Sequence, residues 1–259
     1  MMIIDTHAHY DDKAFDEDRE SLLESMQAAG IKHIVNIGSS MDACRRTVEL
    51  MKQYEFIYGA LGVHPCDSEH LTEADIEWIK QQSSLEKCVA IGEIGLDYYW
   101  DEPDREIQRK WFVRQLQLAK EVNLPVCIHS RDAAQETVDI MKAEHAEQIG
   151  GVVHCYSYSR ELAKTFLDMG YCFGIGGVVT FNNGRKLKEV VDYVPMDKIV
   201  LETDCPYLAP VPFRGKRNDS AKLSYVAEMI AQIKGISVEE VERITSENAY
   251  KLYPKMMRY

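Results

Sequence analysis

The chain alternates short apolar segments with longer amphipathic ones, and this alternation restricts the fold more than any other feature of the sequence. The apolar segments are rich in valine and isoleucine and too short for helices, which is typical of strands buried on both faces. We predict strands at Ile3–Asp5, His33–Ile37, Ile57–Leu61, Val89–Ile91, Pro125–His129, Gly151–His154, Cys172–Ile175 and Ile199–Glu202. Strands that alternate with helices predict a parallel sheet.

Helical patterns occupy the longer segments. One pattern ends at Gly30, which suits a helix C-terminus, and another begins at Pro103, which suits a first helical turn. Ser159 is a good N-cap for the helix that follows it. The helical segments that we predict include residues 15–30, 103–123, 159–170, 222–235 and 237–253.

Eight strand–helix units in 259 residues match the TIM (β/α)8 barrel. An open, doubly wound sheet also alternates strands with helices, but no G-x-G-x-x-G motif follows a predicted strand. We therefore favour an α/β fold of the TIM-barrel class, with extra helices after the last strand. Because no linker-like segment divides the chain, residues 1–259 are expected to form one barrel domain.

Composition disfavours several other classes of protein. Hydrophobic residues make up 46% of the chain, which predicts a packed core. No apolar run approaches the roughly 20 residues of a membrane helix, and the opening MMII is too short for a signal peptide, so we expect a cytoplasmic protein. The seven cysteines are scattered without a C-x-x-C pair, and all are expected to be small buried hydrophobic residues.

The chain is acidic, with 30 Lys and Arg residues against 42 Asp and Glu residues and a formal net charge of −12. Such a chain has no general electrostatic attraction for nucleic acid. An anionic substrate would therefore need metal ions or a local basic patch.

Polar residues of the kinds that bind metals follow the predicted strands at the ends where barrel enzymes carry their chemistry. They are His7, His9, Glu93, His129, His154 and Asp204, with His64 after the third strand. Five of the eight histidines thus lie at strand ends. Because alternate residues of a strand point to the same side, His7 and His9 can bind one ion together.

Each of these residues has an ordinary structural interpretation when it is taken alone. A lone core histidine usually forms a hydrogen bond, Glu93 could cap a helix, and Asp204 could start a turn. The joint pattern favours a metal site instead. Six nitrogen and oxygen ligands exceed what one four-coordinate ion needs, so we expect two neighbouring divalent cations with Glu93 as the bridging carboxylate.

Several motifs carry a resemblance to a known family. DTHAH, GVHP, GEIGLDY, IHSRDA, HCYS and ETDCPYLAP, in that order, resemble the TatD family of metal-dependent deoxyribonucleases, which belongs to the amidohydrolase-type metal barrels. The resemblance extends from Asp5 to SENAYKLY. It implies an amidohydrolase-like barrel and an enzyme that hydrolyses ester bonds, namely the phosphodiester bonds of DNA. It also implies 3′–5′ exonuclease action as one possible mode of cleavage. Where the family's loop usually continues RGKRN-E-P, this chain has Asp219 and Ser220, which leaves the shape of that loop open.

The resemblance also implies how the ligands are shared between two metal ions. One ion would lie near His7, His9, Glu93 and Asp204, and the other near Glu93, His129 and His154. Asp204 is the candidate base that takes a proton from water, and Glu93 is the second catalytic residue. The ligand types favour Zn, Mn, Fe or Co over Mg, although the family is often assayed with magnesium, so Zn, Mn and Mg all remain candidates.

Substrate contacts are predicted from basic residues near the barrel mouth. FRGKRN contains Arg214 and Arg217 just after the last strand, and we favour phosphate contact for both over a solvated face. Arg131 and His64 are further candidates. The aromatic residues 98–100 could stack on bases or cover the rim, and both alternatives stay open.

DNA is the expected substrate, with no membrane and no obligate protein partner. The main alternative is an amidohydrolase or small phosphoester hydrolase that uses the same two metals. A second alternative, a binding protein with a structural metal, is disfavoured because structural sites are usually closed and four-coordinate.

Overall fold

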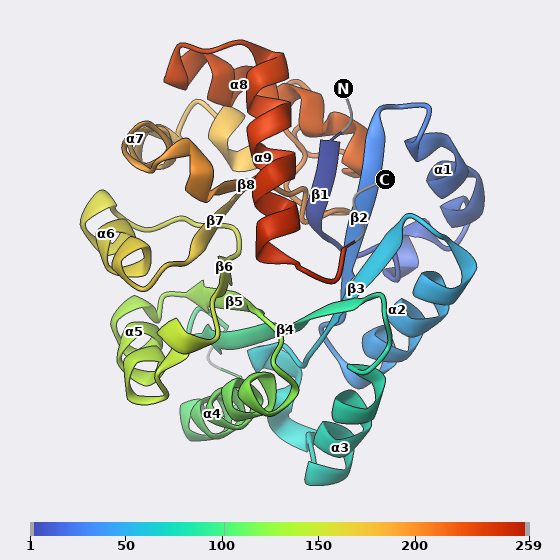
Figure 1. Ribbon diagram of the computed structural model, residues 1–259, viewed down its shortest axis with the longest axis vertical. Coiled ribbons are helices and arrows are strands. Elements are labelled where there is room, and N and C mark those ends of the chain that lie inside the picture. Colours follow the sequence, from blue (N-terminus) through green and yellow to red (C-terminus); the bar gives the residue numbers. More distant parts are fainter. Residues whose placement is uncertain (1–2, 101, 257–259) are drawn as a thin grey trace.

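The computed structural model describes residues 3–100 and 102–256, and within them eight parallel strands form a barrel surrounded by helices (Figure 1). Neighbouring strands pair in chain order, from β1 to β8. The predicted TIM barrel is therefore confirmed. The strands are β1 Ile3–Ala8, β2 Ile31–Ile37, β3 Ile57–Leu61, β4 Cys88–Asp97, β5 Val126–Arg131, β6 Gly151–Val153, β7 Cys172–Ile175 and β8 Ile199–Leu201.

Helices follow the strands and pack outside them (Figure 1). Two helices, α8 and α9, follow β8, as the sequence predicted. The helices are α1 Arg19–Met26, α2 Met41–Gln53, α3 Glu73–Gln82, α4 Arg105–Val122, α5 Ala134–Ala143, α6 Arg160–Asp168, α7 Arg185–Tyr193, α8 Leu223–Lys234 and α9 Val238–Leu252.

The barrel closes where the chain beyond β8 meets the end of β1. The N–H groups of Thr203 and Asp204 donate to the His7 carbonyl at 3.3 and 2.9 Å, and the His9 N–H donates to the Cys205 carbonyl at 2.9 Å. This seam holds the residues after β8 directly beside the residues at the end of β1.

Helix α9 closes the N-terminal end of the barrel interior. Leu252 and Tyr253 near its end pack with the inward-facing side chains Ile4, Val35 and Tyr58, all of them buried. Figure 1 shows α9 lying across the ring of strands. Because that end is filled with apolar side chains, the polar residues of the interior gather at the opposite, C-terminal end.

Several element boundaries differ from the sequence prediction, and β1, for example, continues to Ala8 instead of stopping at Asp5. Strand β4 continues to Asp97 instead of stopping at Ile91, because its polar residues point into the barrel mouth rather than ending the strand. Helix α4 begins at Arg105 and not at Pro103, because the Asp104 carboxylate accepts the Glu106 N–H at 2.8 Å and caps the helix there. Helix α1 ends at Met26, and a turn follows it up to Gly30.

All seven cysteines are free, and five of them are buried. Cys66 and Cys155 are half-buried instead, so the expectation of seven buried thiols is wrong for these two. The reason is their position, because they follow β3 and β6 and line the barrel mouth. No helix in residues 3–100 or 102–256 combines the length and the apolar character needed to cross a membrane.

Candidate metal centre

The barrel brings the six predicted metal ligands into one cluster at the C-terminal ends of the strands. His7 Nε2 lies 3.1 Å from His9 Nε2 and 3.5 Å from Glu93 Oε2. Asp204 Oδ1 completes this group, at 3.4 Å from His9 Nε2 and 3.7 Å from His7 Nε2. His7 lies on β1, His9 directly follows that strand, Glu93 lies on β4, and Asp204 follows β8. The seam between β1 and the chain after β8 holds the two histidines beside Asp204.

The second oxygen of Glu93 faces a different pair of histidines. Glu93 Oε1 lies 2.8 Å from His129 Nδ1 on β5 and 3.6 Å from His154 Nε2 just after β6. Strands β4 and β5 approach closely here, since a Cβ at Gly95 would lie 1.8 Å from the His129 carbonyl oxygen. Glu93 therefore has one oxygen toward each half of the cluster, which is the arrangement of a bridging carboxylate.

The spacing within the cluster matches a metal coordination sphere. Ligand atoms about 2.1 Å from a tetrahedral ion lie about 3.4 Å from one another. His7 Nε2 and His9 Nε2 lie 3.1 Å apart, and each lies 3.4–3.8 Å from an oxygen of Glu93 and of Asp204. The two histidine nitrogens and the Asp204 oxygen are thus spaced as ligands of one cation.

The outer nitrogens of two histidines form hydrogen bonds with oxygen acceptors, which places a proton on each of those nitrogens. The contacts are His9 Nδ1 with the Ile37 carbonyl at 2.9 Å and His129 Nε2 with Asp97 Oδ2 at 3.0 Å. A carbonyl or carboxylate oxygen only accepts, so the outer nitrogen carries the proton. His154 Nδ1 lies 3.2 Å from Glu202 Oε1 as an ion-pair contact, without the geometry of a hydrogen bond. The inner nitrogens face Glu93 and Asp204, so each either donates a proton to a carboxylate, as an imidazolium does, or offers its lone pair to a cation bound between them.

The pKa values of Glu93 and His154 indicate that the ligand cluster attracts positive charge. Burial opposes ionisation of Glu93, yet the charge of His154 and the hydrogen bonds from His129 and His7 hold its pKa well below 4.5. Burial disfavours the imidazolium of His154, but Glu202 and Glu93 raise its pKa to about 10. The carboxylates thus stay ionised and attract protons or metal ions into the cluster.

Two members of the site, Asp97 and Glu202, were missed from the sequence. Asp97 accepts from His129, and Glu202 lies beside His154, where the absence of a side chain at Gly174 makes room for it. The sequence spacing could have identified both residues. Asp97 shares a strand face with Glu93, and Glu202 is two residues from Asp204. Both carboxylates orient ligand candidates.

Asp5, which the sequence left unassigned, is fully buried in the seam between β1 and β8. Its carboxylate accepts hydrogen bonds from the His7 N–H at 3.2 Å, from the Thr203 hydroxyl at 2.6 Å and from the Ser220 hydroxyl at 2.6 Å. Burial raises the pKa of Asp5 to about 7. Asp5 therefore holds the backbone of the ligand-bearing strand and does not touch the imidazole rings.

A cavity of about 790 Å³ opens onto the cluster and contains two of the predicted substrate contacts. His64 Nε2 lies 3.9 Å from Glu93 Oε1, and burial lowers the pKa of His64 to about 3, so its ring is neutral. The Arg131 guanidinium lies over the Tyr99 ring, 3.8 Å from its centre. Both side chains are placed to meet a molecule that enters the mouth.

Arg214 and Arg217 lie away from this cavity wall. Arg217 forms a bidentate ion pair with Asp18 at 2.5 and 2.7 Å, and Arg214 lies over the Phe181 ring, 4.5 Å from its centre. Neither lines the cavity that contains the ligand cluster. Their contact with phosphate stays a prediction.

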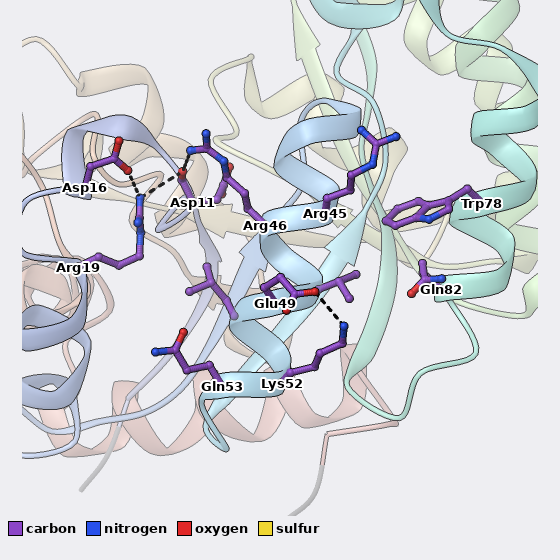
Figure 2. Close-up of a pocket in the computed structure, with 12 residues that line it drawn as sticks. Asp11, Asp16, Arg19, Arg45, Arg46, Glu49, Lys52, Gln53, Trp78 and Gln82 are labelled. Carbon is purple, nitrogen blue, oxygen red and sulfur yellow. Dashed lines mark hydrogen bonds and ion pairs between the residues drawn. The ribbon is translucent and has the colours of Figure 1, made fainter.

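A second cavity, of about 660 Å³, lies between α1, α2 and α3 (Figure 2). Its cations are engaged within the protein, since Arg19 pairs with Asp16 at 2.6 Å and Lys52 with Glu49 at 2.8 Å. None of the potential metal-binding groups found among the described residues lies on its wall. The barrel mouth is therefore the candidate active site.

A TIM barrel with histidine and carboxylate side chains gathered at its C-terminal mouth is an arrangement typical of a metal-dependent hydrolase. Residues 4–254 match the model of the family described as TatD related DNase. The chain belongs to this family, as the motifs predicted.

Individual relatives agree with this assignment. The chain is 47% identical to the uncharacterized metal-dependent hydrolase YabD of Bacillus subtilis, over 97% of this chain and 99% of that protein. It is 34% identical to the putative deoxyribonuclease TATDN3 of Mus musculus, over 98% of this chain and 89% of that protein. The solved structure of YJJV, a TatD homologue from Escherichia coli, is similar with a TM-score of 0.91 and 31% identity, over 97% and 98% of the two chains.

Proposed function

We propose that this TatD-type hydrolase is a deoxyribonuclease that cleaves phosphodiester bonds of DNA with two divalent metal ions. The observation that carries the proposal is Glu93, whose two carboxylate oxygens face separate pairs of histidine nitrogens. Two cations a few ångströms apart are the usual arrangement for in-line displacement at phosphorus. Membership of the TatD related DNase family and the name of the mouse relative support DNA as the substrate.

The donor set assigns the residues that would hold each ion. One ion would be held by His7, His9, Glu93 and Asp204, and the other by Glu93, His129 and His154. Bound divalent ions supply Lewis acidity, which neutralises charge on phosphoryl oxygens and makes a nearby water molecule more acidic. The four imidazoles favour zinc or manganese over magnesium.

Asp204 is the residue best placed to take the proton of the attacking water. Its side chain is 18% exposed, whereas that of Glu93 is 5% exposed, so Asp204 is the carboxylate that water from the cavity reaches. Burial opposes its ionisation, but hydrogen bonding to His9 and the charge of His154 hold its pKa below 3.8. Asp204 is thus ionised and able to accept a proton near neutral pH.

Substrate binding would begin at the cavity wall. Arg131 and His64 face the site at which a scissile phosphate meets the cluster, and Arg131 carries the positive charge. Arg214 and Arg217 would contact phosphates farther along the strand, outside the cavity. The proposed cleavage includes 3′–5′ exonuclease action as one mode, and the proposed location of the protein is the cytoplasm.

A small phosphoester is the second candidate substrate, because Arg131 is the one lysine or arginine among the described residues of the cavity wall. A substrate panel decides between the two candidates. The wild-type protein is assayed on single-stranded DNA, duplex DNA, RNA, small phosphoesters and small amides, each with Mg, Mn and Zn.

The proposal expects kcat/KM to be highest on DNA, and it expects Asp204→Asn to abolish that activity. A small ester or amide hydrolysed with a far higher kcat/KM than any DNA would refute deoxyribonuclease function. End-labelled strands in the same assay distinguish endonuclease from exonuclease products.

A further inference from the structure

The large apolar side chains that are exposed in the described part of the chain all lie on two loops at the barrel mouth. One loop connects β4 to α4, and the other follows β8. The exposed residues are Tyr99, Trp100, Tyr207, Leu208 and Val211. Single exposed apolar side chains are common, but a group gathered at one opening marks a surface that binds something.

Two of the aromatic residues belong to the wall of the cavity that contains the metal centre. Trp100, 63% exposed, and Tyr207, 55% exposed, line this cavity together with Glu93 and Asp204. The Tyr207 hydroxyl donates to Asp12 Oδ2 at 3.0 Å, which holds the ring in place. Both rings therefore border the space in which a bond would be cleaved.

The Trp100 loop is connected directly to the metal centre through Asp97. Asp97 Oδ1 accepts the N–H groups of Tyr99 at 3.0 Å and Trp100 at 3.4 Å, while Oδ2 lies 3.0 Å from His129 Nε2. The guanidinium of Arg131 lies 3.8 Å from the centre of the Tyr99 ring and 5.9 Å from that of Trp100. One buried carboxylate thus positions both a ligand candidate and the aromatic loop.

The charges on the cavity wall determine what these rings can bind. Arg131 is the single lysine or arginine on the described wall. Six carboxylates share that wall, namely Asp11, Asp12, Asp67, Glu93, Asp97 and Asp204. Phosphate groups away from the metal ions would meet net negative charge there, whereas a flat uncharged group could lie on an exposed ring. A nucleobase is such a group, and stacking on an aromatic ring tolerates every base.

We propose that Trp100 and Tyr207 stack on nucleobases that flank the scissile phosphate. The inference rests on the proposed deoxyribonuclease function and adds a specificity determinant to it. Recognition inside the cavity then depends on bases that are free to leave the helical stack, whereas the proposed phosphate contacts of Arg214 and Arg217 lie outside it. The enzyme needs a base beside the bond that it cleaves.

The test compares two single-stranded substrates of equal length, oligothymidylate and an oligomer of abasic tetrahydrofuran residues, which share the same backbone charge. Each stacking contact accounts for about ten-fold in binding. Wild-type protein is therefore expected to favour oligothymidylate by about a hundred-fold in kcat/KM. Trp100→Leu and Tyr207→Leu each lower that ratio by about ten-fold, mainly through KM, while Trp100→Phe and Tyr207→Phe stay within about three-fold of wild type.

Val211→Ala is the matched control, because Val211 is exposed on the same loop as Tyr207 but does not line the cavity. This variant is expected to keep the wild-type ratio. A wild-type ratio near one, or an unchanged ratio in both leucine variants, overturns the stacking proposal while DNA hydrolysis itself stands. Absence of hydrolysis of both oligomers, alongside fast hydrolysis of a small ester, instead refutes the deoxyribonuclease function.

A binding measurement keeps the inference testable without turnover. Intrinsic fluorescence of metal-free wild-type protein is titrated with oligothymidylate and with the abasic oligomer, and Trp100→Phe serves as the reference for the other tryptophans. Quenching by oligothymidylate that disappears in Trp100→Phe supports the stacking contact. Equal quenching in both proteins contradicts it.

Discussion

Replacing Asp97 by asparagine tests how the metal centre is organised. Asp97 accepts hydrogen bonds on both oxygens, from His129 on one side and from the Tyr99 and Trp100 N–H groups on the other. Asparagine has one acceptor oxygen, so its NH2 group must face a donor on one side. When it faces His129, the imidazole proton moves to Nδ1, the nitrogen that is directed at Glu93. His129 would then offer no lone pair to a metal.

The size of the effect follows from the interaction that is lost. A hydrogen bond to a charged group contributes about 1.5–3 kcal/mol. Removing a carboxylate that orients a histidine ligand typically weakens metal binding by about 10–100-fold, or about 1.4–2.8 kcal/mol. The two figures agree. We therefore expect Asp97→Asn to weaken the site of His129 and His154 by this factor and to leave the site of His7 and His9 within about three-fold.

The assay is a titration of metal-free protein with zinc or manganese in competition with a chromophoric chelator, which measures affinity without any substrate. Asp67→Asn is the matched control, since it also removes one carboxylate from the cavity wall but not from the ligand cluster. Equal affinities in Asp97→Asn, Asp67→Asn and wild type would refute the reasoning. A loss confined to the other site would refute the assignment of His129.

Three further predictions concern catalysis, stability and DNA binding. Asp204→Asn should lower kcat by about 10²–10⁴-fold with an unchanged circular dichroism spectrum, and near-wild-type turnover would exclude Asp204 as the base. Burial lowers the pKa of His33 to about 4, so between pH 6.5 and 4 the unfolded chain binds a proton that the folded protein does not. The free energy of unfolding should thus fall by about 1–2 kcal/mol more in wild type than in His33→Phe as the pH drops through this window, and parallel urea-denaturation profiles would contradict the assignment. Reversing the charges of Arg214 and Arg217 together should weaken DNA binding and reduce its salt dependence, as measured by fluorescence anisotropy at several salt concentrations; unchanged curves would remove both residues from the proposed substrate path.

The sequence by itself determined the architecture and most of the candidate centre. The positions of the apolar segments predicted eight strands in parallel order, because each strand is recognised from its own residues and parallel strands need helical crossovers. Residues at strand ends such as His7, Glu93 and Asp204 could be expected to meet, since all the strands of a barrel point their C-terminal ends at one mouth. The end of β4 and the start of α4 were predicted less well from the sequence. For β4 the reason is that a polar residue inside a strand resembles the end of the strand.

Only the tertiary structure decided how each side chain is used. Asp97 and Glu202 were found through contacts between residues 32 and 47–48 positions apart in the chain, in which Asp97 meets His129 and Glu202 meets His154 and Cys155. Arg217 pairs with an aspartate 199 positions away, a partner that no local pattern indicates. Sequence periodicity reports which face of an element a residue occupies, but the tautomer of a histidine and the partner of an arginine depend on atoms that only folding brings within hydrogen-bonding distance.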